Sequence, residues 1–380
     1  MARTGSGAPV GEAGHASHPV AQSNATGNGT GDVWYLLDTR RALKPLIYQT
    51  RKAPNFVALT AETDDNVFNR SQYVYGVDAR RNAGYGFWQL AHASNATLNA
   101  ENLTAAITAM ETRTGDHGRP LGISPNLLVV AGGDGTVNEA INGLMSPALN
   151  GRKRPALGVL PIGRGNDFAF GMGIPHELTA ACNTLTGGQR RRIDIGRVTG
   201  GDYPDGRYFG NGVVLGFDTV VGFEAAKMKW LHGGASYLVA VIRTIFKYAK
   251  APVYEITLDD GVLRQPFLMV SVMNGRRMGG AFMMAPDGNP SDRIFDLCLA
   301  GDVHQMRILP LAATFISGTQ GKDRAVSMRR STKITVRAIE GRIPAHADGE
   351  TICTEGEMLT IEILPDAMDV LTHPNGWQAV

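Results

Sequence analysis

Apolar and polar positions alternate in blocks along the first half of the chain. After about Ser71, short apolar runs are each followed by segments with helical spacing of their apolar residues. The pattern predicts strands at 72–77, 126–131 and 156–160, and helices at 100–112, 137–144 and 175–186. Strands that alternate with helices are typical of a parallel, doubly wound α/β sheet.

Beyond about Asp194 the pattern changes. Strand-like segments follow one another with turn residues between them, at 207–215, 253–258, 267–274, 294–299, 333–338 and 358–364. One helical segment, 237–248, interrupts the series. Strands at this spacing predict an antiparallel, sandwich-like second domain.

The chain of 380 residues is long enough for two domains, because single cores rarely exceed about 250–300 residues. We expect a nucleotide-binding-type α/β domain at 71–195 and a β-rich domain at 196–364, with residues 365–380 returning to the first domain. Residues 1–30 are small, polar and rich in glycine, which predicts a disordered tail. Residues 31–70 form an extension to which the sequence assigns no chemistry.

The overall composition is that of an ordinary globular protein. A formal net charge of +2 gives no global electrostatic reason to expect nucleic-acid binding. The three cysteines lie far apart, as expected of thiols in a reducing compartment. No signal-like segment and no apolar run of about 18 residues is visible, so we expect a cytoplasmic protein.

A glycine turn stands between the strand at 126–131 and the next helix. Its residues are Gly132, Gly133, Asp134, Gly135 and Thr136. Glycine lets a backbone approach a ligand closely, and the N–H groups of a helix N-terminus favour phosphate. In such a turn Asp134 is placed to hold a magnesium ion, and Thr136 to bond a phosphate. The alternative is a plain βα turn in which Asp134 or Thr136 caps the helix. No GxxxxGK[ST] motif occurs, and GxGxxG does not fit residues 132–139.

The segment GGDGTVNEAINGL at 132–144 resembles the signature of the diacylglycerol kinase catalytic family, which includes bacterial lipid kinases, sphingosine kinases and ceramide kinases. Further segments resemble that family in the right order: PIGRGNDF at 161–168, FGNG at 209–212 and DGE at 348–350. The resemblance covers about 71–375. It implies a nucleotide-binding α/β domain related to those of NAD kinase and phosphofructokinase, a β-sandwich-like domain, and ATP in the cleft between them.

The resemblance also implies roles for particular residues. Asp292 is the expected catalytic base, and Asp134 and Asp167 are expected to hold the metal. Contacts to the nucleotide are expected from Gly132, Gly133, Asp134, Gly135, Thr136, Glu139, Gly163, Arg164, Gly165, Asn166, Asp167 and Glu350, and contact to the lipid headgroup from Asp218. Plainer roles stay open for several of them: a turn for Asp292, a helix cap for Asp167, a solvated helix face for Glu139 and a hairpin turn for Glu350.

The chain departs from the family pattern at three places. Arg164 stands where the family usually has threonine, and either contacts phosphate or blocks the pocket. Arg293 replaces the glycine that follows the expected base. The early phosphate-binding segment is poorly matched, and residues 82–86 are its nearest candidate.

These patterns predict an ATP- and Mg²⁺-dependent lipid kinase that phosphorylates a lipid hydroxyl of diacylglycerol, a sphingoid base or another lipid alcohol. Its partner is then a lipid at a membrane surface, contacted peripherally, with no nucleic acid; a homodimer stays open. The basic and apolar stretch at 227–250 would lie in a lipid interface or pack in the core. Two alternatives remain: a kinase of a soluble substrate, and a catalytically impaired homologue that binds nucleotide or lipid for regulation.

Overall fold

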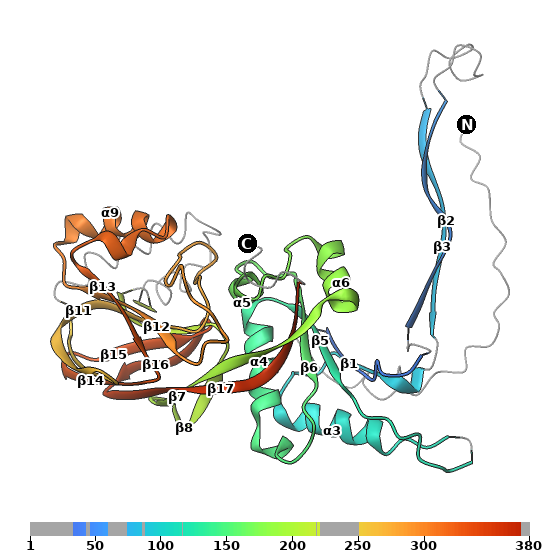
Figure 1. Ribbon diagram of the computed structural model, residues 1–380, viewed down its shortest axis with the longest axis horizontal. Coiled ribbons are helices and arrows are strands. Elements are labelled where there is room, and N and C mark those ends of the chain that lie inside the picture. The colour runs from blue at the N-terminus through green and yellow to red at the C-terminus, as the bar shows by residue number, and fades with distance from the viewer. Residues whose placement is uncertain are drawn as a thin grey trace.

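The chain folds into an α/β part, a β-rich part and a long two-stranded ribbon (Figure 1). The computed structural model describes residues 33–42, 46–59, 74–85, 88–115, 117–217, 219–220 and 251–373. The predicted tail at 1–30, the predicted helix at 237–248 and the stretch at 227–250 therefore lie outside the described residues, as does Asp218.

The sheet of the α/β part is mixed. Its centre is a parallel pair, β5 (Leu127–Gly132) and β6 (Ala156–Pro161). On the far side of β5, β1 (Val33–Leu37) runs antiparallel to it, and β4 (Ala91–Ser94) runs antiparallel to β1. The α/β class is confirmed, and the parallel pairing is confined to the centre of the sheet.

In the described part of the chain, four helices accompany this sheet: α3 (Ala100–Glu111), α4 (Asp134–Met145), α5 (Asp167–Gly171) and α6 (Leu178–Gly187). Polar side chains fix where two of them start. Asn99 Oδ1 accepts from the Asn102 backbone N–H at 2.8 Å, and the Glu177 carboxylate accepts from two N–H groups of α6. Short 3₁₀ turns lie at η1 (Trp88–Leu90) and η2 (Pro147–Leu149).

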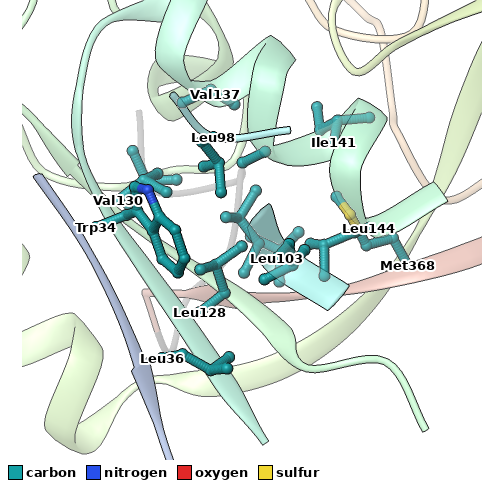
Figure 2. Packing of buried hydrophobic residues seen from close by; sticks show 14 of the residues in the cluster. Trp34, Leu36, Leu98, Leu103, Leu128, Val130, Val137, Ile141, Leu144 and Met368 are labelled. Atoms are coloured by element: carbon teal, nitrogen blue, oxygen red, sulfur yellow. The ribbon is translucent and has the colours of Figure 1, made fainter. Parts of the chain in front are cut away.

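The core of the α/β part lies between α3, α4 and the sheet (Figure 2). Trp34 and Leu36 of β1 are buried in it beside Leu128 and Val130 of β5. The N-terminal strand is thus part of the hydrophobic core, and the sequence had given no role to this segment.

The β-rich part is built from antiparallel strands. They are β8 (Tyr203–Phe209), β9 (Gly212–Gly216), β10 (Val253–Leu258), β11 (Gly261–Met273), β12 (Phe295–Gly301), β13 (Val326–Ser331), β14 (Lys333–Glu340), β15 (Ile343–Ala347) and β16 (Glu350–Gly356). A second hydrophobic cluster fills the space between them. The predicted strands at 253–258, 294–299 and 333–338 are confirmed within two residues, and the one at 267–274 is the second half of β11, which begins at Gly261.

Two long strands belong to both parts. β7 (Gln189–Gly200) and β17 (Met358–Thr372) pair antiparallel from Leu359↔Gly200 to Thr372↔Gln189. Ile193 and Val370 are buried in the first core, whereas Val198 and Ile361 are buried in the second. β17 also touches β6 in parallel, at Val370↔Leu157.

A ribbon of β2 (Leu46–Leu59) and β3 (Val74–Tyr85) projects away from the body (Figure 1). Among the described residues the two strands form a sheet of their own. Residues 82–85, the nearest candidate for an early phosphate segment, belong to β3 and pair with β2 near its start. Phosphate binding by this candidate stays a prediction.

A helix and an apolar layer cover the outside of the β-rich part. The helix α9 (Gln305–Ile316) packs over a third hydrophobic cluster on β9, β11 and β12, and the short turn η3 (Gln320–Lys322) follows it. Beneath α9 lies a cavity of about 70 Å³ with an entirely apolar lining. Among the described residues, no helix is long and apolar enough to cross a bilayer.

The predicted strand at 207–215 is in fact two strands. β8 ends at Phe209 and β9 begins at Gly212. A buried carboxylate, Asp348, accepts hydrogen bonds from the backbone N–H groups of Gly210, Asn211 and Gly212 and so holds a turn between them. Apolar periodicity does not carry this signal, because the residue that makes the turn is 136 or more positions away.

Candidate functional site

Two glycine turns meet at the carboxyl ends of β5 and β6. The first, 132–136, joins β5 to α4; the second, 163–166, joins β6 to α5. A Cβ on Gly163 would lie 2.3 Å from the Gly133 Cα, and one on Gly165 would lie 2.8 Å from Asp134 Oδ2. Only glycine fits at these two positions, since real Cβ atoms do not approach so closely.

Asn166 shapes the second turn. Its backbone is left-handed, with φ of 53°, a conformation that asparagine tolerates. Its buried side chain closes the turn on itself, because Oδ1 accepts from the Gly163 N–H at 3.0 Å and Nδ2 donates to the Gly163 carbonyl at 2.8 Å. Asn166 is therefore placed to hold the turn rather than to reach outward.

Asp134 is a desolvated carboxylate between the two turns. Its Oδ1 accepts from the Phe168 N–H at 3.0 Å, so it caps α5 across the gap. Burial, together with the nearby charges of Asp167 and Asp348, raises the pKa of Asp134 to about 6. A carboxylate in such surroundings favours a bound proton or a bound cation.

Asp167 is held by the β-rich part. Its Oδ1 accepts from Arg277 Nε at 2.8 Å, and both of its oxygens lie 3.0 Å from the Gly280 N–H. Arg277 also donates to the Gly165 carbonyl at 2.9 Å, and its guanidinium lies 4.1 Å from the centre of the Phe170 ring. Asp167 thus joins the second turn to the β-rich part in this arrangement.

Asp348 is a residue that the sequence reasoning missed as a separate site. It is buried, its backbone is left-handed with φ of 49°, and its carboxylate accepts from Gly210, Asn211 and Gly212 and from Asn138 Nδ2. Burial raises its pKa. The signal was present in the DGE segment, from which only Glu350 had been taken as a site residue.

Asn138 and Asn142 of α4 complete the contact between the two parts. Asn138 Oδ1 accepts from Arg207 Nη2 at 2.7 Å, and the Asn142 side chain bonds both backbone groups of Tyr208. The middle of α4, the helix that follows the first glycine turn, is in this way tied to the β-rich part.

Glu350 and Thr136 each lie beside a glycine of the first turn. The Glu350 side chain is 46% exposed and lies 3.9 Å from Arg207 Nη2, and its Oε1 would be 3.5 Å from a Cβ on Gly135. Thr136 is buried, and a Cβ on Gly132 would lie 2.3 Å from its Oγ1. Glu139 is half-buried on α4, whereas Arg164 is exposed on the second turn.

Asp292, the expected base, belongs to a different cluster. It forms an ion pair with Arg330, which also lies 3.2 Å from Asp296. Its Oδ1 is buried and accepts no hydrogen bond from any residue that the structure describes. The next residue, Arg293, donates its N–H to Asp194 Oδ2 at 2.7 Å.

One side chain connects the two clusters. Asn274 Nδ2 donates to the carbonyls of Asp194 and Gly210, each at 2.9 Å, and the Gly210 N–H in turn reaches Asp348. Asp194, which accepts from the Arg293 N–H, is thus linked through Asn274 to the turn that Asp348 holds. The charges that act on Asp134 come from Asp167 and Asp348.

The described residues provide few side-chain ligands for a metal ion. No cluster of three or more His, Cys, Asp or Glu side chains is found among them. Asp134 Oδ2 lies beside Gly165, whereas both oxygens of Asp167 are engaged. A Mg²⁺ ion usually takes one or two protein carboxylates and completes its shell with phosphate oxygens and water. The site fits an ion that arrives with a phosphorylated ligand and binds Asp134.

Known proteins match the two parts of the chain differently. Residues 211–372 match the family described as the YegS C-terminal NAD kinase beta sandwich-like domain. A diacylglycerol kinase of Bacillus subtilis is 31% identical over 59% of this chain and 71% of its own length. A probable lipid kinase YegS-like protein of Yersinia pseudotuberculosis is 31% identical over 67% of this chain and 81% of its own length.

Solved structures agree on the fold. A Bacillus anthracis structure described as a diacylglycerol kinase superposes with a TM-score of 0.52 at 21% identity, covering 72% of this chain and 84% of that one. At this identity the similarity supports the fold alone.

The N-terminal part has another relative. Residues 8–148 match the family described as Mu-like prophage major head subunit gpT. The Mu-like prophage FluMu major head subunit of Haemophilus influenzae is 47% identical over 32% of this chain and 41% of its own length, so the chain spans less than half of that relative. This match contains the segment of β1 and α3 and also the first glycine turn.

Proposed function

Since the chain belongs to the family of diacylglycerol kinases and YegS-like lipid kinases, we propose that it transfers the γ-phosphoryl group of ATP to the hydroxyl of a lipid alcohol. Diacylglycerol is the first candidate substrate. The family match at 211–372 covers most of the β-rich part, and the segments at 132–144 and 161–168, which contain the glycine turns, resemble the same family.

The observation that carries the proposal is the meeting of the two glycine turns at the N-terminus of α4. Backbone N–H groups there are not used within the helix, and the helix dipole favours negative charge at this end. The close approach of Gly163 to Gly133 leaves backbone rather than side chains on this surface. Such a surface suits the phosphates of a nucleotide.

Mg²⁺ is part of the proposal. Asp134 would hold the ion beside the phosphates, and the ion would neutralise charge that develops during phosphoryl transfer. Asp167 would add a second carboxylate through Oδ2, which accepts from the Gly280 N–H but not from Arg277. Exposed Arg164 on the second turn is placed to contact phosphate where relatives are expected to have threonine.

Two carboxylates, those of Asp292 and Asp348, are our candidates for the catalytic base. Asp292 has an oxygen that accepts no hydrogen bond within the described part of the chain, and this oxygen would face the substrate hydroxyl. Asp348 lies close to Asp134, but its oxygens already accept four hydrogen bonds. A positioned base is worth about 10²–10⁴ in rate, so the substitution to asparagine separates them.

We take the apolar cavity in the β-rich part as the candidate site for the first part of a lipid chain. The apolar cavity beneath α9 is lined by side chains such as Phe217, Met269, Phe282 and Phe315. Apolar pockets of this kind accommodate hydrocarbon, because burial of its surface is favourable by roughly 25 cal/mol per Å². Phe217 directly precedes Asp218, the residue predicted to meet the headgroup.

The deciding experiment is Mg²⁺-dependent transfer of labelled phosphate from ATP to lipids in mixed micelles. Wild-type protein is compared with Asp134→Asn, Asp292→Asn and Asp348→Asn. Labelled lipid that forms with wild type but not with Asp134→Asn supports the proposed kinase activity. Of Asp292→Asn and Asp348→Asn, the variant with the larger loss of kcat identifies the base. ATP binding without label in any lipid would contradict the proposal and favour a regulatory homologue; label in a soluble acceptor alone would favour a soluble substrate.

A further inference from the structure

Helix α9 is apolar on two opposite faces. Its inner face, with Ile308, Leu311 and Phe315, is buried against the cavity. Its other face carries exposed apolar residues. A surface helix of a globular protein normally presents polar residues outward, and a helix that is apolar all round is normally covered by protein or lipid.

The outer face of α9 consists of Met306, Leu309, Pro310, Ala313 and Ile316. Their spacing of three and four residues places them on one side of the helix. Met306 is 80% exposed, Leu309 46% and Ile316 58%. The charged residue of the helix, Arg307, lies beside this face and forms an ion pair with Asp323 at 2.9 Å.

The outer face is open in the fold. Figure 1 shows α9 on the outside of the β-rich part, across β11, β12 and β13. Of the described elements, η3 lies beside it at its end. Contiguous exposed apolar residues of this kind mark interaction sites, because they are costly to leave in water.

Basic residues follow directly after the helix. Lys322 and Arg324 are exposed and make no ion pair with any residue that the structure describes. Asp302 and Asp323 are the nearby acids in sequence, and Asp323 is already paired with Arg307. Unpaired cations beside an apolar helix face suit an anionic lipid surface.

We propose that the outer face of α9 docks on an anionic membrane, with Met306, Leu309 and Ile316 inserted at the headgroup boundary and Lys322 and Arg324 against the lipid phosphates. The inner face of the same helix bounds the cavity. Docking therefore places the proposed acyl site directly beneath the bilayer surface. The role that we give to docking rests on the proposed lipid kinase activity. The vesicle-binding test does not depend on that activity.

The test uses the full chain and vesicles of phosphatidylcholine with and without phosphatidylglycerol. The variant Met306→Ser, Leu309→Ser, Ile316→Ser removes the apolar face without touching the cavity lining. Its matched control, Leu178→Ser, Val262→Ser, Met358→Ser, removes three large exposed apolar residues elsewhere on the surface. Co-sedimentation measures vesicle binding, and circular dichroism checks that both variants fold.

We expect the α9 variant to bind anionic vesicles on the order of tenfold or more weakly than wild type, while the control binds normally. Lys322→Gln with Arg324→Gln should weaken binding to anionic vesicles by about fivefold per charge and leave binding to neutral vesicles unchanged. Phosphorylation of a water-soluble, short-chain diacylglycerol should be equal in wild type and the α9 variant.

Equal vesicle binding by wild type and the α9 variant would overturn the inference, as would a wild type that binds no vesicles. A wild-type dimer that the α9 variant converts to a monomer, with vesicle binding unchanged, would assign the face to a second copy of the chain. Loss of vesicle binding in the α9 variant, with no kinase activity even in wild type, would retain the docking surface and reject the proposed function.

Discussion

Arg293 stands at a backbone position that favours glycine. Its φ is 66°, in the left-handed region that costs a residue with a Cβ roughly 1–2 kcal/mol. The ion pair of its side chain with Asp366 at 2.6 Å is largely exposed, and such pairs contribute about 0–1 kcal/mol. The sequence had marked this residue as a departure from the family pattern, and the geometry gives that departure a physical meaning.

Arg293→Gly should therefore be more stable than Arg293→Ala, by about 1 kcal/mol in the free energy of unfolding. Both variants lose the ion pair, so their difference reports the backbone alone. Urea denaturation of the two variants at pH 7 measures it. Equal midpoints would show that the position stores no strain.

The raised pKa of Asp134 predicts that the free energy of unfolding depends on pH. Burial raises its pKa from 3.8 to about 6, so between these values the folded state holds a proton that the unfolded state has lost. Its contribution is present below about pH 4 and is lost as the pH rises through about 6. Asp134→Asn should become more stable relative to wild type as the pH rises from 4.5 to 7.5.

Chemical denaturation at pH 4.5, 6 and 7.5 checks this expectation. A difference between the two proteins that is constant with pH would contradict the raised pKa. Addition of Mg²⁺ with ATP at pH 7.5 should raise the midpoint of wild type more than that of Asp134→Asn, because a bound cation favours the charged carboxylate.

The sequence predicted the local parts of the candidate site but not the contacts between distant residues. The glycine turn, Asp134 and the second turn were all identifiable, since their residues stand close together in the sequence. The partners of Asp167, by contrast, are Arg277 and Gly280, more than 100 residues away. Long-range pairing of this kind leaves no local pattern, and the sequence therefore gave Asp167 as a metal ligand or a cap without the arginine.

At the scale of elements, local periodicity predicted helices and inner strands well. The helix at 100–112 and the strand at 126–131 match α3 and β5 within one residue at each end. The helix at 305–316 was not predicted, and it contains Pro310, a residue that normally ends or kinks a helix. β1 was not placed in the sheet, because the segment at 31–70 resembled no part of the kinase family.

β1 should nevertheless be essential to the fold. Trp34 is 1% exposed in the first core, and its Nε1 donates to the Ala96 carbonyl at 2.8 Å. Trp34→Ala should lower the free energy of unfolding by about 3–5 kcal/mol. The exposed neighbour Tyr35→Ala is the matched control, expected to cost far less. Similar losses for the two variants, measured by urea denaturation, would contradict the buried role of β1 in the sheet.

At the scale of the whole molecule, the segment similar to a phage head subunit divides in two. β1, β4 and α3 are built into the α/β part, whereas β2 and β3 form a ribbon that pairs only with itself among the described strands. An isolated two-stranded hairpin adds little stability in water.

Replacement of residues 43–87 by a short Gly-Ser linker should therefore leave the rest of the fold intact. We expect a thermal midpoint within about 4 °C of wild type, which corresponds to less than about 1 kcal/mol. Differential scanning calorimetry and ATP binding measure the outcome. A large loss of either would show that the ribbon supports the body of the molecule.

The pairing of β7 with β17 along both parts has a mechanical consequence. Two domains joined by a flexible linker can rotate about it as rigid bodies. Here the connection is a pair of hydrogen-bonded strands that is continuous from one core to the other, apart from an irregularity between Leu364 and Met368. We expect such a connection to bend elastically and to return to its original shape. Opening of the site would then be a small, reversible flexure, and each release of product would return the two halves to the same starting position.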